Sequence, residues 1–148
     1  MDTTNHGSNR IDDSVDPTAM LVEAFGRMPF GVSVWSLDHR LLYWNDAYLS
    51  LYRTPPDLVR HGMTLRERLS LSFLEHPISD ERFDLIVARH ESRLAEARAS
   101  GGPLVRVDRV GGVTVERTYL ECPGLGYVVI HVDETAQLDR EAAMRAHN

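Results

Sequence analysis

The sequence predicts an α+β fold in which helices cover one face of a single antiparallel sheet. Two short apolar runs at residues 32–35 and 41–44 flank a polar break, which is typical of a β-hairpin. Helical patterns fill the middle of the chain, and three further strand-like runs follow residue 103. Strands in two groups that helices separate indicate an α+β arrangement.

The composition indicates one globular domain in a reducing compartment. The chain has 148 residues and a net charge of −6, and all 16 basic residues are arginines. This acidic balance argues against nucleic-acid binding. The single cysteine, Cys122, excludes an internal disulfide. No apolar run approaches the roughly 20 residues of a membrane span and no signal peptide is evident, so we expect a cytoplasmic protein without membrane insertion.

The first predicted helix carries a candidate interaction surface. Residues 1–15 are polar and are expected to form a disordered arm. Asp16 and Pro17 match a helix N-cap followed by proline in the first turn, and Pro29 ends the pattern. The apolar residues at helical spacing are Met20, Leu21, Ala24, Phe25 and Met28. They could dock on the chain's own sheet or on another molecule, and we expect a homodimer through them.

Three more helix starts follow in the middle of the chain. Asn45-Asp46 precedes a helix at residues 45–53, and residues 64–67 form a capping-box pattern before another. Ser79 begins the longest helix, which reaches about residue 99 before a Gly-Gly-Pro break. His90 lies on the apolar face of this helix, in line with Phe83 and Val87.

The last third of the chain is predicted to form strands and a short final helix. Residues 104–110 and 113–121 alternate in polarity on either side of Gly111-Gly112, a two-residue hairpin turn. Residues 127–132 are almost continuously apolar, so this strand and the one before it are expected to be central. Asp133 to Thr135 caps the final segment, residues 136–148.

The stretch GVSVWSLDHRLLYWNDAYLSLYRTPPDLVRHGMTLRERL resembles the N-terminal half of a PAS domain, and is most similar to a bacterial subgroup with a G-V-x-V…R-L-x-x-W-N-x-x-Y-x-x-L-Y pattern. The matching residues are Gly31, Val32, Val34, Arg40, Leu41, Trp44, Asn45, Tyr48, Leu51, Tyr52, Pro56, Leu58, Val59 and Gly62. Asp133-Glu134-Thr135 resembles the D-x-T that closes many PAS domains and starts the output helix. Ser36 and His39 depart from the family pattern, which often has Asp and Gly there, and we expect them to change the local turn but not the fold.

The resemblance implies a five-stranded antiparallel sheet whose concave face, under the long helix, can hold a small molecule or nothing. The PAS domain would span residues 16–135, including the first helix, and residues 136–148 would form a short C-terminal helix. Asp133 and Thr135 would transfer the signal. The predicted pocket residues are Val34, Tyr43, Phe83, Val87 and His90.

The cofactor remains unknown from the sequence, which gives no positive sign of one. In haem-binding PAS domains a histidine on the corresponding helix ligates the iron, so His90 is the candidate axial ligand if haem is present. The alternative is a core or rim histidine that bonds a carbonyl or water. Flavin also stays open, although the motif of flavin-adduct photosensors is absent and Cys122 stands at a strand end. The remaining histidines are scattered, so no metal site is predicted.

The sequence therefore predicts a stand-alone, single-domain PAS sensory and interaction module of bacterial signal transduction. It would act by contact, through dimerisation or through binding to a sensor histidine kinase of a two-component system or to another PAS protein, because no effector region follows Thr135. The first alternative is a haem or flavin sensor of gas, redox state or light. The second is a small pocket enzyme, but no catalytic constellation supports it and we expect no enzymatic activity.

Overall fold

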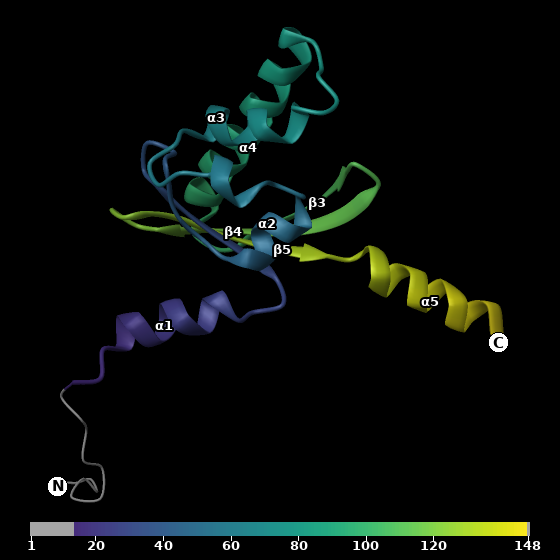
Figure 1. The fold of residues 1–148 in the computed structure, drawn as a ribbon, viewed down its shortest axis with the longest axis horizontal. Helices are drawn as coiled ribbons and strands as arrows, with labels where there is room; N and C mark the ends of the chain where they lie inside the picture. Colours follow the sequence, from purple (N-terminus) through teal and green to yellow (C-terminus); the bar gives the residue numbers. More distant parts are fainter. Residues whose placement is uncertain (1–13, 148) are drawn as a thin grey trace, which may run out of the picture.

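The computed structural model describes residues 14–147, so the predicted polar arm lies almost entirely outside the described residues. The elements in chain order are α1 (Pro17–Gly26), β1 (Gly31–Ser36), β2 (Leu41–Trp44), α2 (Asp46–Leu51), η1 (Pro56–Leu58), α3 (Leu65–Ser70), η2 (Leu71–Phe73), α4 (Asp80–Ser100), β3 (Leu104–Val110), β4 (Val113–Cys122), β5 (Gly126–Asp133) and α5 (Thr135–His147). They form the α+β arrangement that the sequence predicts (Figure 1).

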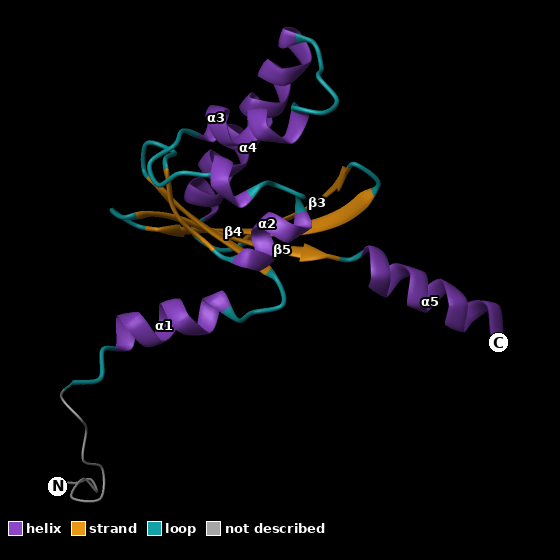
Figure 2. Ribbon diagram, viewed as in Figure 1, coloured by secondary structure: helices purple, strands orange, loops and turns teal. Residues whose placement is uncertain are grey.

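The five strands make one antiparallel sheet in the order β2-β1-β5-β4-β3. The apolar strand β5 lies in the centre between β1 and β4, as its composition predicts. Helices α3 and α4 stand over one face of the sheet, α1 lies on the opposite side, and α5 extends away from the end of β5 (Figure 2). The concave space between the sheet and the helices is therefore separated from α1 by the sheet itself.

Side-chain caps begin the helices where the sequence predicts. Thr64 and Glu67 form a reciprocal capping box at α3, and the Ser79 hydroxyl accepts the Arg82 amide at the start of α4. Helix α3 is followed directly by the 3₁₀ turn η2, which tightens its C-terminal end. Gly101 ends α4 with a left-handed φ of 69°, which glycine adopts at little cost.

Two turns explain how the hairpins close. Gly111 and Gly112 have φ angles of 55° and 85°, so both central residues are left-handed, as a two-residue hairpin loop requires. In the β1–β2 turn His39 has a φ of 61°, at the position where the PAS pattern often has glycine. The departure at His39 thus leaves an L-residue in a conformation that costs it about 1 kcal/mol, while the strands still pair.

The core lies between the sheet and the helices above it. Its buried apolar residues are Trp35, Leu41, Tyr48, Leu49, Val59, Met63, Leu65, Leu94, Ala97, Tyr119, Tyr127 and Val129. Helix α1, by contrast, has no buried residue among those described. Within residues 14–147, none of the helices is both long and apolar enough to cross a membrane.

Candidate ligand pocket and its polar network

A cavity of about 460 Å³ lies between the inner face of the sheet and helices α2, α3 and α4. This volume is within the range of small-molecule sites, roughly 300–1,000 Å³. One part of the wall is apolar and is formed by Trp35, Leu65, Leu69, Phe73, Leu85, Ile86, Leu94 and Val129. The rest of the wall carries polar and charged side chains, and it is this part that can give the pocket its chemistry.

His131 on β5 is the centre of a hydrogen-bonded chain in the pocket wall. Its Nε2 lies 2.8 Å from the Ser33 hydroxyl, and its Nδ1 lies 2.6 Å from the Tyr52 hydroxyl. Trp35 Nε1 donates to Ser33 at 2.9 Å, and Arg117 Nε donates to Tyr52 at 2.9 Å. These hydrogen bonds thus join β1, the C-cap of α2, β4 and β5.

Burial keeps His131 and Tyr52 uncharged at neutral pH. It lowers the pKa of His131 well below the ordinary value, and the positive charges of Arg117 and Arg68 lower it further. Burial also raises the pKa of the Tyr52 phenol above its ordinary value. At neutral pH the imidazole of His131 is therefore neutral, with one N–H and one acceptor nitrogen.

The hydrogen bonds between Ser33, His131 and Tyr52 use fewer protons than these three groups carry. The two bonds to His131 need two protons, whereas the Ser33 hydroxyl, the Tyr52 hydroxyl and a neutral imidazole carry three. Trp35 and Arg117 donate into the chain from its ends and so take up none of these protons. Whichever tautomer His131 adopts, one hydroxyl proton has no acceptor within the chain.

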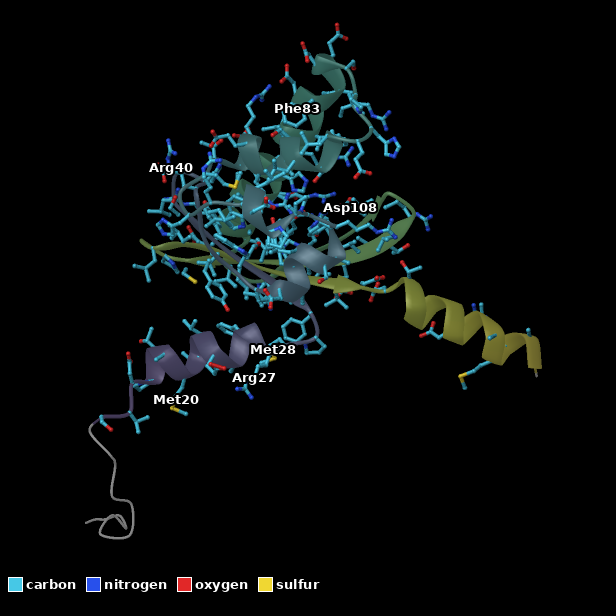
Figure 3. All side chains as sticks on the ribbon, in the orientation of Figure 1. Met20, Arg27, Met28, Arg40, Phe83 and Asp108 are labelled. Atoms are coloured by element: carbon cyan, nitrogen blue, oxygen red, sulfur yellow. The ribbon has the colours of Figure 1, made fainter. Side chains whose placement is uncertain are left out.

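Arg117 continues this chain into an ion-paired cluster. Its Nη1 lies 2.5 Å from Asp108 Oδ2, and Arg93 binds both carboxylate oxygens of Asp108 from α4. Figure 3 shows Asp108 on β3, on the helix side of the sheet. The hydrogen bond from Arg93 and the charge of Arg117 hold the pKa of Asp108 below its usual value. This cluster ties α4 to β3 and β4 across the pocket.

Arg68 on α3 is the second buried arginine of the pocket wall, and its hydrogen bonding is incomplete. Its side chain is only 2% exposed, and its guanidinium lies over the Tyr48 ring at 4.8 Å. Nη2 donates to the Thr54 hydroxyl at 2.9 Å. Nε and Nη1 have no hydrogen-bond partner in the part of the chain that the structure describes. Buried polar groups are almost always paired, so these nitrogens need an explanation.

A family model described as the PAS fold matches residues 25–142. This chain belongs to the PAS family. The PAS domain of Bordetella pertussis BvgS is 21% identical with a TM-score of 0.59, and the match covers 90% of this chain and 98% of that one. A domain of an HTR-like protein from Haloarcula marismortui ATCC 43049 is 17% identical with a TM-score of 0.50, covering 73% and 100%. None of the curated proteins matches the sequence significantly.

An RNA-binding light-oxygen-voltage receptor is a further structural neighbour of this PAS domain. It is 18% identical with a TM-score of 0.51, and the match covers 93% of this chain and 41% of that one. At these identities the neighbours support the fold alone. The PAS fold and its five-stranded antiparallel sheet, as the resemblance implies, are thus confirmed.

The structure brings only one of the five predicted pocket residues into the PAS cavity. His90 lines it from α4, where burial and the charges of Arg117 and Arg93 lower its pKa to about 3. Phe83 instead stacks edge-on against Phe73 and lies under Arg66, outside the described lining of the cavity. Val87 is buried in the same helix and is likewise outside that lining.

Val34 and Tyr43 are corrections, because they lie on the opposite face of the sheet. The side chains of Ser33 and Trp35 lie on the face of the sheet that carries the cavity. Because successive side chains of a strand point to opposite faces, Val34 between them points away from the cavity. Tyr43 pairs with Val34, and its hydroxyl donates to the Val22 carbonyl in α1 at 3.3 Å. Both residues therefore lie on the face of the sheet opposite the pocket, where Tyr43 supports α1.

The predicted interaction and signal-transfer residues occupy the two ends of the domain. On α1, Met20 is 60% and Leu21 57% exposed, Ala24 is exposed, and Phe25 is half-buried, as is Met28 just beyond the end of the helix. Asp133 accepts the Thr135 amide at 2.9 Å, and the Thr135 hydroxyl accepts the Thr114 amide at 2.7 Å. The D-x-T thus joins the start of α5 to the start of β4.

The residues of the pocket do not fit a haem or a flavin adduct. His90 supplies a neutral imidazole, which suits an axial bond. The sheet surface beside it, however, carries the ion pair of Arg117 and Asp108 instead of an apolar platform for a macrocycle. Cys122 lies at the end of β4 and is not among the described residues that line the cavity. No group of three or more metal-ligating side chains occurs within residues 14–147.

Sequence reasoning missed Arg68, Arg117 and the role of His131. Arg68 follows Leu65 by three residues and precedes Leu69 by one, so helical spacing alone places it on the face of α3 that those leucines bury. Arg117 lies on the same buried face of β4 as Val115 and Tyr119, two residues from each. A charged residue at a core position of a periodic pattern was the available signal.

Proposed function

We propose that this PAS domain is a sensory module of bacterial signal transduction whose output is protein–protein contact. The contact would be a homodimer, or a complex with a sensor histidine kinase or another PAS protein. Membership of the PAS family supports the sensory role, since PAS domains are sensory modules that are generally not enzymes. The observation that carries the proposal is the exposed apolar surface of α1.

Helix α1 presents apolar side chains that its own domain leaves uncovered. Met20, Leu21 and Val22 are 60%, 57% and 47% exposed. Figure 3 shows Met20 on the side of α1 that faces away from the sheet. Covering such side chains is worth about 1.5–3 kcal/mol each when burial is complete. A partner surface would recover this free energy, and a two-fold dimer would recover it from both copies.

The helix is nevertheless held in a defined place on the domain. Asn45 Nδ2 donates to the carbonyls of Phe25 and Phe30 at 2.7 and 3.0 Å, and Tyr43 donates to Val22. The contact surface is therefore pre-positioned against β1 and β2, which reduces the ordering cost of binding. A change in the sheet can also reach α1 through these bonds.

The output end would be the D-x-T of Asp133 and Thr135. Thr114 receives two backbone links from this motif, since its amide donates to the Thr135 hydroxyl and its carbonyl accepts the Glu134 amide at 2.8 Å. Thr114 also accepts a hydrogen bond from Arg109, which lines the pocket. Bonds between the pocket wall and the first turn of α5 support a role of these residues in signal transfer.

The oligomeric state tests the proposal directly. We expect the wild-type protein to sediment as a dimer at micromolar concentration and Leu21→Glu to shift it to monomer by at least tenfold in dissociation constant. Leu125→Glu is the matched control, because Leu125 is 77% exposed on the β4–β5 turn, remote in sequence from α1. A wild-type monomer whose capture of histidine kinases and PAS proteins is unchanged by Leu21→Glu would refute contact through α1. A Soret or flavin band in the purified protein would favour the cofactor sensor instead.

A further inference from the structure

The pocket wall has a strongly cationic lining in an acidic protein. Among the described residues, five arginines and a single aspartate line the cavity, whereas the whole chain has a net charge of −6. The arginines are Arg68, Arg82, Arg89, Arg109 and Arg117. Both histidines of the wall are neutral, so they do not change this balance. The field inside the cavity therefore favours an anion over a cation.

The two buried arginines of this wall differ in what satisfies them. Arg117 donates to Tyr52 and forms an ion pair with Asp108. Arg68 has the single bond from Nη2 to Thr54, and no carboxylate of the described residues pairs with it. The hydrogens on Nε and Nη1 are three of the five N–H donors of a guanidinium. A buried cation with at least these three donors unused is costly unless an acceptor is supplied from outside.

The side chains around Arg68 indicate what that acceptor carries. Tyr48 stacks under its guanidinium, and Leu65 and Leu69 flank it on α3. Across the cavity the wall continues with Trp35, Leu94 and Val129. The hydrogen-bonded chain around His131 contributes one further hydroxyl proton that has no acceptor within that chain. A ligand with an anionic head and an apolar body would satisfy both parts of the wall.

We propose that the pocket binds a small organic acid, with its carboxylate on Arg68 and its apolar body against Trp35, Leu65 and Leu94. This inference rests on the proposed sensory function, since it names the chemical class that the module would sense. A single carboxylate matches a single unpaired buried guanidinium. A phosphate would bring a larger desolvation cost and no apolar part for the cavity of about 460 Å³.

Calorimetric titration of the full chain with octanoate and 3-phenylpropionate tests the proposal. Octan-1-ol and 3-phenylpropan-1-ol are the matched neutral probes, with the same apolar bodies and no charge. We expect both acids to bind and each alcohol to bind at least tenfold more weakly. Arg68→Gln keeps the length of a polar side chain and should weaken both acids about 10- to 100-fold, the worth of a charge-assisted hydrogen bond. Arg60→Gln, an exposed arginine outside the described lining, should change affinity less than twofold.

Several results would overturn the proposal. They are failure of both acids to bind, equal binding of acids and alcohols, or equal binding by wild type and Arg68→Gln. If Arg68→Gln does not fold, the ¹⁵Nε–H resonance of Arg68 in the wild type decides: it should shift on addition of octanoate, and a resonance that stays in place while octanoate binds refutes the assignment. Binding is measured on the protein alone, so its failure is distinct from failure of the proposed contact through α1, which sedimentation reports.

Discussion

Asn45 is the residue whose replacement tests the folding argument most sharply. Its Oδ1 accepts the amides of Val32 at 2.9 Å and Tyr48 at 3.0 Å, so it caps α2 and holds β1 at once. Its Nδ2 donates to the carbonyls of Phe25 and Phe30. The side chain is only 3% exposed. Asn45→Leu would remove all of these bonds and leave their backbone partners buried.

The cost can be worked from these contacts. Loss of an N-cap costs about 1 kcal/mol. An unpaired buried amide such as that of Val32 costs about 1–3 kcal/mol, and the two carbonyls add somewhat less. We therefore expect Asn45→Leu to lower the free energy of unfolding by about 4 kcal/mol, out of a total of about 5–15 kcal/mol for a domain of this size. At about 4 °C per kcal/mol, Tm falls by about 15 °C.

Thermal unfolding followed by circular dichroism measures the effect, with two further variants for comparison. Asn45→Asp keeps the Oδ1 acceptor but loses both donors to Phe25 and Phe30, so it should cost about 2 kcal/mol. Asp16→Ala removes the cap of α1, whose side chain accepts the Thr18 amide at an exposed site. Because α1 has no buried residue among those described, this loss should move Tm by less than about 3 °C. A shift for Asn45→Leu no larger than that of Asp16→Ala refutes the reasoning.

Three further outcomes are expected. Between pH 6.5 and pH 4 the Tm should fall, because the unfolded chain binds protons at His90 and His131, whose pKa values burial lowers in the folded state, to about 3 for His90. His90→Gln should make this slope shallower and leave the part due to His131, and an equal slope in both proteins would contradict the lowered pKa of His90. Gly126→Ala should prevent folding, since a Cβ there would lie 2.0 Å from the Trp35 carbonyl oxygen, and soluble protein with native circular dichroism would disprove this contact. Thr135→Val should expose the Thr114 amide to faster hydrogen exchange while leaving octanoate affinity within twofold, and unchanged protection would argue against the bond.

The parts of the fold that the sequence predicts are those decided locally. The caps at Asn45, Thr64 and Ser79 each depend on a side chain and the amide three residues later, so a few residues of sequence are enough to predict them. The Gly111-Gly112 turn is equally local, because both residues must be left-handed. The central place of β5 follows from its apolar composition, which reflects neighbours on both sides.

The pocket could not be predicted in the same way, because its contacts join distant positions. Ser33 and His131 are 98 residues apart, and neither position is distinguished within its own strand. The prediction that Val34 and Tyr43 line the pocket was wrong because successive side chains of a strand point to opposite faces of the sheet. An error of one residue in the alternation therefore assigns a side chain to the wrong face. Phe83 and Val87 share the apolar face of α4 with His90, but Phe83 lies about two turns earlier in the helix, against Phe73, and Val87 is buried outside the described lining of the cavity.

Arg68 and Arg117 differ in how far their contacts offset the free-energy cost of burying a charge. Replacing a buried ion pair with apolar residues is often neutral or stabilising, because desolvation offsets the attraction. Arg117 at least regains its hydrogen bonds from Tyr52 and Asp108, whereas Arg68 regains one from Thr54 and a stacking contact with Tyr48. An apolar side chain in place of Arg68 would remove an uncompensated charge from the interior of the protein without breaking any ion pair in the described residues. Folding alone therefore does not account for Arg68, and residues that break a local rule without structural gain are those expected at binding sites.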